Sequence, residues 1–269
     1  MRIGLSTASF FKKKLTEDAL SFISAANVPC CEVFLASFSE YKQSFAKLLA
    51  QRKGNTEIVS VHTLNQQYEP ELFNLVDRAR KDSETILSRV ARAAETVGAR
   101  YYTFHGPAML RRVNYHLDYE RIGKRVQQLC EFVDKKSGHT TALCYENVHW
   151  CYFSNPDFIT RILPYAPSLK TCLDVKQALQ SGFSPEEYIK TMGERLTNVH
   201  LCDYNIDKTA LPGQGTYDFE RLFGILLENG YRGDAMIEVY SGDYDGYDEL
   251  MTSYEYVNNC LTRALRAGV

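Results

Sequence analysis

Short apolar segments rich in β-branched and aromatic residues alternate along the chain with longer segments whose apolar residues recur at helical spacing. The alternation occurs eight times in 269 residues, and ~34 residues per unit are typical of one strand followed by one helix. The predicted strands are residues 3–6, 31–35, 58–62, 101–105, 142–147, 171–174, 198–201 and 235–239. The pattern therefore predicts an alternating β/α fold.

Capping signals support the helical segments between these strands. Ser184 is followed by Pro185 and then by Glu187, three positions after the serine, which predicts a capping box at a helix start. Gly98 follows a long periodic segment and suits the left-handed residue that commonly ends a helix. Residues 72–97 place apolar side chains at helical spacing with charged residues between them, so we expect one long helix there.

The order of these units favours a closed barrel. Alternating strands and helices require parallel strands, and eight parallel strands close most economically on themselves. Such a barrel needs ~250 residues, and no Pro/Gly-rich linker divides this chain of 269. We therefore predict that residues 1–269 form a single (β/α)8 TIM-barrel domain of the α/β class. An open doubly wound sheet is the alternative, and it is weakened because no GxGxxG segment follows a predicted strand.

The composition is that of an ordinary globular protein, with 45% hydrophobic and 24% charged residues. Lys and Arg number 31 against 33 Asp and Glu, and this formal charge of −2 argues against a nucleic-acid partner. No apolar run approaches the ~18 residues of a membrane span. The eight cysteines include no CxxC pair, so neither a disulfide framework nor a zinc knuckle is expected. We expect a cytoplasmic protein without a membrane partner.

Six successive predicted strands carry a His, Asp or Glu near the C-terminal end. One such residue alone is more often structural, but acidic residues number only 33 and histidines only six. Six matches at equivalent positions are therefore not expected by chance, and barrel enzymes build their active sites at this end of the strands. The six residues are His62, His105, Glu146, Asp174, His200 and Glu238.

Carboxylates that a barrel brings together repel one another and are costly to remove from water. A cation removes that cost. A set made mostly of oxygen ligands suits Mn²⁺ or Mg²⁺ and tolerates Zn²⁺ or Co²⁺. We therefore expect one divalent metal ion as the cofactor.

With these residues, the chain resembles the xylose isomerase-like TIM-barrel superfamily over essentially its whole length. That superfamily contains sugar phosphate isomerases and epimerases and the endonuclease IV family, and the segments 212–219 and 229–233 share the resemblance. In the ketose 3-epimerase-like members, a Glu, Asp, His, Glu quartet at the ends of strands five to eight holds the metal. The residues that match this quartet are Glu146, Asp174, His200 and Glu238.

The chain also departs from the family pattern after strand six and strand seven. The family usually has Asp-x-x-His after strand six, whereas this chain has Gln177 in place of the histidine. The endonucleases use an Asp-x-His that is Asp207-Lys208-Thr209 here, so two of three expected ligands for a third zinc are missing. The arginine with which the epimerases commonly hold substrate is absent between His200 and Gly215. Phosphodiester hydrolysis is therefore disfavoured, and the usual ketose substrates are not assured.

The resemblance implies a metal-dependent isomerase or epimerase of a sugar, polyol or sugar phosphate, with a role in carbohydrate metabolism. A divalent ion polarises the substrate carbonyl and stabilises the enediolate formed on deprotonation. Glu146 and Glu238 would be the catalytic acid–base pair on either side of the substrate. Asp174 and His200 would be metal ligands without a part in proton transfer.

Five further residues are expected to bind substrate. His62 and His105 would contact substrate oxygens, although they could instead hold a second ion together with Glu146. Lys176 lies two residues after Asp174 and could hold an anionic group, although a solvated lysine is the commoner case. Aromatic residues after several strands could form a wall of the pocket. The expected substrate-binding residues are His62, His105, Lys176, Gln177 and Trp150.

Other functions remain open on the same scaffold. A lyase or dehydratase of a cyclic polyol would use a different arrangement of bases, and an endonuclease IV-like hydrolase would need extra metal ions. A non-catalytic binding member would keep the barrel without activity. The expected partner is a small carbohydrate, and the sequence leaves open whether copies of the chain form a homo-oligomer.

Overall fold

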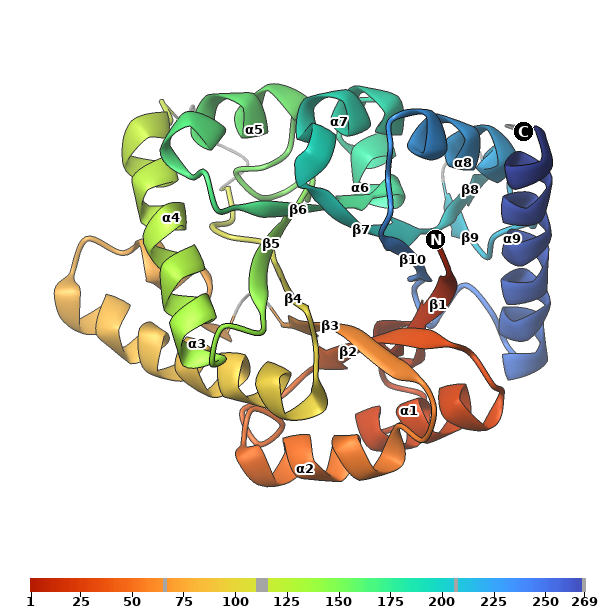
Figure 1. Ribbon diagram of the computed structural model, residues 1–269, viewed down its shortest axis with the longest axis horizontal. Helices are drawn as coiled ribbons and strands as arrows, with labels where there is room; N and C mark the ends of the chain where they lie inside the picture. The colour runs from red at the N-terminus through yellow and green to blue at the C-terminus, as the bar shows by residue number, and fades with distance from the viewer. Residues whose placement is uncertain (65–66, 110–115, 206–207, 268–269) are drawn as a thin grey trace.

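The computed structural model describes residues 1–64, 67–109, 116–205 and 208–267. Eight parallel strands close into a barrel in the order β1-β10-β7-β6-β5-β4-β3-β2, as Figure 1 shows. The prediction of a (β/α)8 TIM barrel is confirmed. The barrel strands are β1 (Ile3–Ser6), β2 (Cys30–Leu35), β3 (Glu57–Thr63), β4 (Tyr101–Phe104), β5 (Ala142–Glu146), β6 (Lys170–Asp174), β7 (Leu196–Leu201) and β10 (Asp234–Ile237).

Helices surround the strands on the outside of the barrel (Figure 1). A short antiparallel hairpin of β8 (Asp203–Asn205) and β9 (Lys208–Ala210) follows β7. The described α-helices are α1 (Thr16–Ala25), α2 (Gln43–Arg52), α3 (Asp77–Val97), α4 (Tyr119–Lys136), α5 (Pro156–Ile162), α6 (Val175–Gln180), α7 (Pro185–Met192), α8 (Phe219–Glu228) and α9 (Tyr247–Ala267). Short 3-10 turns are η1 (Thr7–Phe10), η3 (Pro70–Phe73), η4 (Leu163–Tyr165) and η5 (Gly193–Arg195).

The capping signals of the sequence are present in the structure. The hydroxyl of Ser184 accepts a hydrogen bond from the backbone N–H of Glu187, and the Glu187 carboxylate accepts one from the backbone N–H of Ser184 at 2.8 Å. Gly98 ends α3 with a φ of 78°, in the left-handed region that glycine adopts without strain. Both helix boundaries are therefore determined locally.

The prediction of one helix over residues 72–97 is wrong at its N-terminal end, because α3 begins only at Asp77. Asn74 is extended, with a ψ of 140°, and its side chain accepts a hydrogen bond from the backbone N–H of Val76. This local bond replaces the helical pattern at that point. Leu75 and Val76 are consequently 76% and 57% exposed instead of lying on the buried face of the helix.

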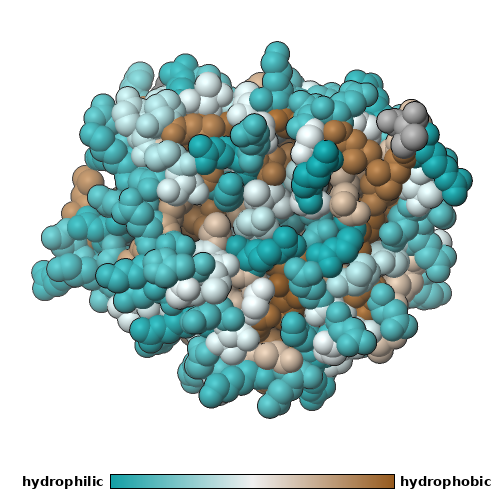
Figure 2. Space-filling model, viewed as in Figure 1, coloured by the Kyte–Doolittle hydropathy of each residue, from teal (hydrophilic) through white to brown (hydrophobic). Residues whose placement is uncertain are grey.

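Most apolar side chains lie between the strands and the surrounding helices, and the face viewed down the barrel is mainly hydrophilic (Figure 2). The barrel interior also contains a polar layer beneath the C-terminal ends of the strands. Its members come from four strands and are fully buried. They are Glu32, Ser60, Thr103 and Asn198. Ser60, Thr103 and Asn198 each donate a hydrogen bond to Glu32, so these groups form an ordered polar layer under the strand ends.

Candidate active site and metal centre

The four residues predicted to bind metal lie together at the C-terminal ends of the strands. Glu146 and Asp174 end β5 and β6, His200 lies within β7, and Glu238 directly follows β10. One side-chain oxygen or nitrogen atom from each of the four lies within 4.8 Å of the others, and all four residues are buried. The closed barrel is what brings residues so distant in sequence to one point.

Backbone and side-chain hydrogen bonds fix the carboxylate of Asp174. Asp174 is both the last residue of β6 and the N-cap of α6, and its Oδ1 accepts from the backbone N–H of Gln177 at 2.8 Å. Asn147 links β5 to β6, because its side chain donates to the Asp174 carbonyl at 2.9 Å and accepts from the Asp174 N–H at 2.8 Å. The second oxygen, Oδ2, therefore faces the cluster, 4.0 Å from Nδ1 of His200.

His200 presents Nδ1 to the three carboxylates. Nδ1 lies 3.0 Å from Oε1 of Glu146 and 3.7 Å from Oε1 of Glu238. The other ring nitrogen, Nε2, points away from the cluster and lies 3.1 Å from Oε1 of Glu32. Any ion at the centre of the four residues would therefore meet Nδ1 of His200.

The donor set fits a divalent cation. Oε2 of Glu146 and Oε2 of Glu238 are buried, and neither accepts a hydrogen bond from a described residue. Three carboxylates and one imidazole supply mostly hard oxygen ligands with one nitrogen, a combination that suits Mn²⁺, Mg²⁺ or Zn²⁺. An ion there would satisfy buried oxygens that are otherwise costly to keep from water.

The pKa values of two acids in the cluster, Glu146 and Asp174, shift in opposite directions. Burial acts to raise the pKa of Glu146, but the positive charge of His200 and His105 outweighs it and holds the pKa well below its usual range. Burial raises the pKa of Asp174 to about 6 even though the ammonium group of Lys176 opposes the rise. Glu146 is thus the more firmly ionised of the two, and Asp174 is the one that a cation would help most to ionise.

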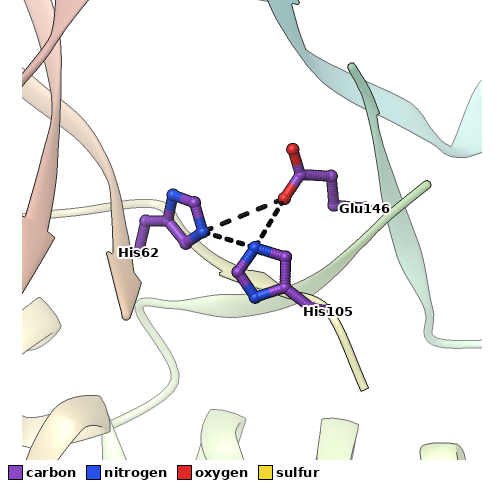
Figure 3. A group of neighbouring side chains, drawn as sticks. All are labelled: His62, His105 and Glu146. Carbon is purple, nitrogen blue, oxygen red and sulfur yellow. Dashed lines mark hydrogen bonds and ion pairs between the residues drawn. The ribbon is translucent and has the colours of Figure 1, made fainter. Parts of the chain in front are cut away.

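A second group lies beside the first and shares Glu146 with it (Figure 3). Nε2 of His62 lies 2.7 Å from Nε2 of His105, and Nε2 of His105 lies 3.1 Å from Oε2 of Glu146. The rings come from neighbouring positions, at the end of β3 and just after β4. These three side chains could also hold a cation, so the geometry alone leaves both earlier interpretations of the histidines open.

Two buried glutamates behind the histidines were missed in the sequence. Oε1 of Glu32 lies 3.2 Å from Nδ1 of His62, and Oε2 of Glu69 lies 3.4 Å from Nδ1 of His105. Glu69 also accepts from the backbone N–H groups of His105 at 2.9 Å and Gly106 at 3.2 Å. A signal did exist for Glu32, because it is the single charged residue of the strand Cys30–Leu35.

All five residues expected to bind substrate line one pocket of about 250 Å³ at this end of the barrel, together with Glu238. Aromatic side chains form much of its wall, and the Trp150 ring stacks against His105 with centroids 6.2 Å apart. A larger groove of about 570 Å³ lies against α3 and α4, but its charged groups are mainly surface residues. The smaller pocket is therefore the better candidate for the active site, because it opens onto the buried acids.

The alternative of a solvated Lys176 is wrong. Lys176 is only 3% exposed. Its Nζ lies 3.4 Å from Oδ2 of Asp174 and 4.6 Å from the centre of the Tyr240 ring. The early start of α6, directly after Asp174, turns this side chain inward. A buried ammonium group therefore lines the pocket.

The positions that depart from the endonuclease pattern have other partners. The side-chain oxygen of Gln177 accepts from the backbone N–H of His149 at 3.2 Å and faces its Nδ1 at 2.6 Å. The hydroxyl of Thr209 donates to Asp243 at 3.1 Å. Asp207 lies outside the described residues.

None of the helices in the described part of the chain combines the length and the apolar composition of a membrane-spanning segment.

The model of the xylose isomerase-like TIM barrel family matches residues 20–259. The chain belongs to this family. A curated relative, inosose dehydratase of Clostridium botulinum, is 32% identical over 84 residues. That match covers 24% of this chain and only 28% of the relative, so it spans under a third of either protein.

Solved structures share the fold over nearly the whole chain. A D-tagatose 3-epimerase-like protein has a TM-score of 0.81 at 16% identity, with both chains covered completely. D-psicose 3-epimerase from Clostridium cellulolyticum H10, crystallised with D-tagatose, has a TM-score of 0.80 at 13% identity, covering 97% of this chain and 99% of that chain. A probable 3-DHS dehydratase from Bacillus anthracis has a TM-score of 0.75 at 13% identity, covering 96% and 99%. At these identities the likeness concerns the fold.

Proposed function

We propose that this protein is a metal-dependent isomerase or epimerase of a small sugar, polyol or sugar phosphate. One observation carries the proposal. Glu146 and Glu238 come from strands that are separated by β6 and β7 in the barrel, yet both reach the same imidazole, at 3.0 and 3.7 Å from Nδ1 of His200. Two carboxylates that approach one point from different sides can take a proton from one position of a substrate and return it at another.

The two glutamates differ in access to the pocket. The side chain of Glu238 is 10% exposed and lines the pocket, whereas that of Glu146 is only 2% exposed. Oε2 of Glu238 accepts no hydrogen bond from a described residue and lies 3.7 Å from Nδ1 of His62, so it can accept a proton from a carbon next to a carbonyl group. We assign Glu238 as the base that removes the proton and Glu146 as the group that returns one to the substrate. Because Glu146 is ionised at rest, the proton that it returns would come from His105, whose Nε2 lies 3.1 Å from Oε2 of Glu146.

A divalent ion, when bound, would polarise the substrate carbonyl and lower the cost of negative charge on its oxygen. Asp174 and His200 would hold the ion together with the two glutamates. His62 and His105 line the pocket and would orient substrate hydroxyl groups. Phe11, Phe34 and other apolar residues of the pocket wall would limit the access of water to the reacting carbon.

Dehydration is the second candidate, and the buried ammonium of Lys176 favours it. A dehydratase begins with the same proton abstraction beside a carbonyl group and then expels a neighbouring hydroxyl. Lys176 lies in the pocket next to Asp174 and could give a proton to that leaving group. The inosose dehydratase relative supports the same possibility for this scaffold.

Proton exchange tests both candidates. The zinc- or manganese-loaded protein is incubated in D₂O with a panel of keto-sugars, sugar phosphates and keto-polyols, and products are followed by NMR and mass spectrometry. We expect deuterium at the carbon beside the carbonyl, with an epimer or isomer as product. A product that has lost water would identify the dehydratase instead, whereas no exchange on any compound would favour a binding protein.

Glu238→Gln should abolish the exchange, because its amide cannot accept the proton. Glu228→Gln is the matched control, since Glu228 is an exposed residue at the end of α8, on the surface of the barrel. Equal exchange in the wild type and Glu238→Gln would contradict the assignment of the base.

A further inference from the structure

A single carboxylate beneath the site, that of Glu32, contacts two of the three histidines of the site. They are His200 in the four-residue cluster and His62 in the pocket wall. Glu32 lies in the middle of β2 and is 0% exposed. Its Oε1 lies 3.2 Å from Nδ1 of His62 and 3.1 Å from Nε2 of His200. In His200 the nitrogen that faces Glu32 points away from the other acids of the site, whereas Nδ1 of His62 faces Glu32 and also lies 3.7 Å from Oε2 of Glu238.

The second oxygen of Glu32 is held by neutral donors from three other strands. Oε2 accepts hydrogen bonds from Ser60 Oγ on β3, from Thr103 Oγ1 on β4 at 2.7 Å, and from Asn198 Nδ2 on β7 at 3.0 Å. These hydrogen bonds fix the orientation of the carboxylate, so that Oε1 faces the two imidazole rings. An ionised carboxylate can only accept hydrogen bonds, so a ring nitrogen that bonds to Oε1 must carry the proton.

We propose that Glu32 is a positioning residue that determines the tautomers of His200 and His62. It keeps a proton on Nε2 of His200 and on Nδ1 of His62. Nδ1 of His200 is then free to bind a metal ion, and Nε2 of His62 is left as the atom that faces Nε2 of His105 at 2.7 Å. The inference rests on the proposed metal centre, and it adds a residue outside the four ligands on which that centre depends.

The opposite tautomer of His200 is also available in this structure, which is why the choice needs a cause. Nδ1 lies 3.0 Å from Oε1 of Glu146 and could donate to it, while Nε2 lies 3.3 Å from Nδ2 of Asn198 and could accept from it. With the proton on Nδ1, the imidazole cannot bind metal at the cluster. Glu146 offers a charged acceptor to Nδ1 and Glu32 offers one to Nε2, so the carboxylate of Glu32 offsets that of Glu146 and keeps Nε2 able to hold the ring proton when an ion occupies Nδ1.

Glu32 could instead be a ligand, since Glu32, His62 and Glu238 form another group with metal-ligand spacing. Its hydrogen bonds argue against that role. Oε2 already has three donors, and Oε1 faces two ring nitrogens. A carboxylate in contact with a metal-binding histidine commonly fixes the orientation and tautomer of the ring, and its loss typically weakens metal affinity ~10- to 100-fold.

The wild-type protein gives the first test. Long-range ¹H–¹⁵N NMR spectra of the histidine rings are recorded with the protein loaded with Zn²⁺, and signals are assigned with His200→Gln and His62→Gln. We expect Nε2–H on His200 with zinc on Nδ1, and Nδ1–H on His62. Zinc on Nε2 of His200, or a proton on its Nδ1, would overturn the inference. A protein that binds no zinc would overturn the metal centre itself and this inference with it.

Glu32→Gln gives the second test, because it changes the hydrogen-bonding character with little change in shape. The three donors would hold the amide oxygen at the position of Oε2, so the amide NH₂ would face the rings and donate to Nε2 of His200. The proton of His200 should then move to Nδ1. We expect the Kd for zinc, measured by competition with a chelating dye, to rise ~10- to 100-fold.

Glu69→Gln is the matched control, because Glu69 is a second fully buried glutamate behind a histidine. It contacts the ring of His105. Zinc affinity should stay within about threefold of wild type and the His200 signals should not move. Circular dichroism checks that each variant folds. If Glu32→Gln folds and keeps wild-type zinc affinity with Nε2–H on His200, the inference is wrong. If it does not fold, the wild-type spectra decide alone.

Discussion

Nε2 of His62 and Nε2 of His105 lie 2.7 Å apart, within hydrogen-bond distance of each other. Behind each ring a buried carboxylate, Glu32 or Glu69, faces the Nδ1 atom. If both rings donate from Nδ1, two bare nitrogen lone pairs would oppose one another. Either a proton or a cation between them removes this repulsion. Burial and the neighbouring His62 act to lower the pKa of His105, yet Glu146 and Glu69 raise it to about 9, which supports a shared proton near neutral pH.

We therefore expect one tightly bound divalent ion per chain, at the four-residue cluster. The shared proton occupies the space that a second ion would need between the two histidines. Metal content after dialysis against trace zinc or manganese, measured by mass spectrometry, should be one equivalent in the wild type and in His105→Gln. Two equivalents in the wild type, with the second lost in His105→Gln, would show that the histidine pair binds metal.

Glu146→Gln and Glu238→Gln should each reduce turnover by ~10²-fold or more, the usual scale for a positioned acid or base. Gln retains the size of Glu and one acceptor oxygen, so the barrel should remain folded. Metal affinity should also fall because a charged ligand is lost, and turnover must therefore be compared at saturating metal. Near-wild-type turnover in either variant with metal bound would rule out the two-carboxylate mechanism.

The fold could be predicted from the sequence because its signals are local. Each barrel strand is a short apolar segment, and closure then brings the residues at successive strand ends together without further information. Glu32 is a lone charge in an apolar strand, but its partners lie on other strands, and Glu69 lies outside the strands, so no spacing rule connects either glutamate to the histidines. The burial of Lys176 depends on α6 starting directly after Asp174. The side chain of Asn74 accepts a hydrogen bond that delays the start of α3, and the spacing of apolar residues does not reveal this bond.

The protein should not cleave abasic DNA efficiently. At two positions where endonucleases of this family carry histidines, Gln177 is held by His149 and Thr209 donates to Asp243, so neither is free to hold a third zinc. The formal charge of −2 also offers little attraction for phosphate. Incubation of an abasic duplex with the zinc-loaded protein at physiological salt should give no nicking above background, with an abasic-site nuclease as positive control. Robust zinc-dependent nicking would contradict this prediction.

Asp234 should stabilise the barrel where its first and last strands meet. The carboxylate accepts from Nε of Arg2 at 3.0 Å and from Nη2 of Arg2 at 2.7 Å, and Arg100 adds a bond at 3.1 Å. Because Arg2 is partly exposed, we expect Asp234→Asn to lower the free energy of unfolding by about 1–2 kcal/mol near neutral pH. Urea unfolding measures this value. Asp157→Asn, in an exposed pair with Arg161 on α5, is the control and should change little.

The same contact determines how the effect depends on pH. Burial acts to raise the pKa of Asp234, but Arg2 outweighs it and holds the pKa below its usual value of 3.8. A lowered pKa in the folded state means that the stabilisation is present above about pH 4 and is lost as the pH falls through the folded-state pKa. The difference between wild type and Asp234→Asn should therefore shrink at about pH 3. A difference that grows in acid would contradict the assignment.

Lys176→Met should weaken substrate binding more than it slows the chemical step. Asp174 outweighs the effect of burial and raises the pKa of Lys176 well above its usual value, so the side chain carries its charge throughout the physiological range. A charged donor in a buried pocket contributes ~1.5–3 kcal/mol to a hydrogen bond, which corresponds to a rise in KM of about tenfold or more. Met has a similar shape and length, which limits the change to the charge. Steady-state kinetics at saturating metal separates the effect on KM from the effect on kcat. An equal fall in kcat and kcat/KM would instead mean that Lys176 acts in the transition state. A dehydratase requires this of a group that protonates a leaving hydroxyl.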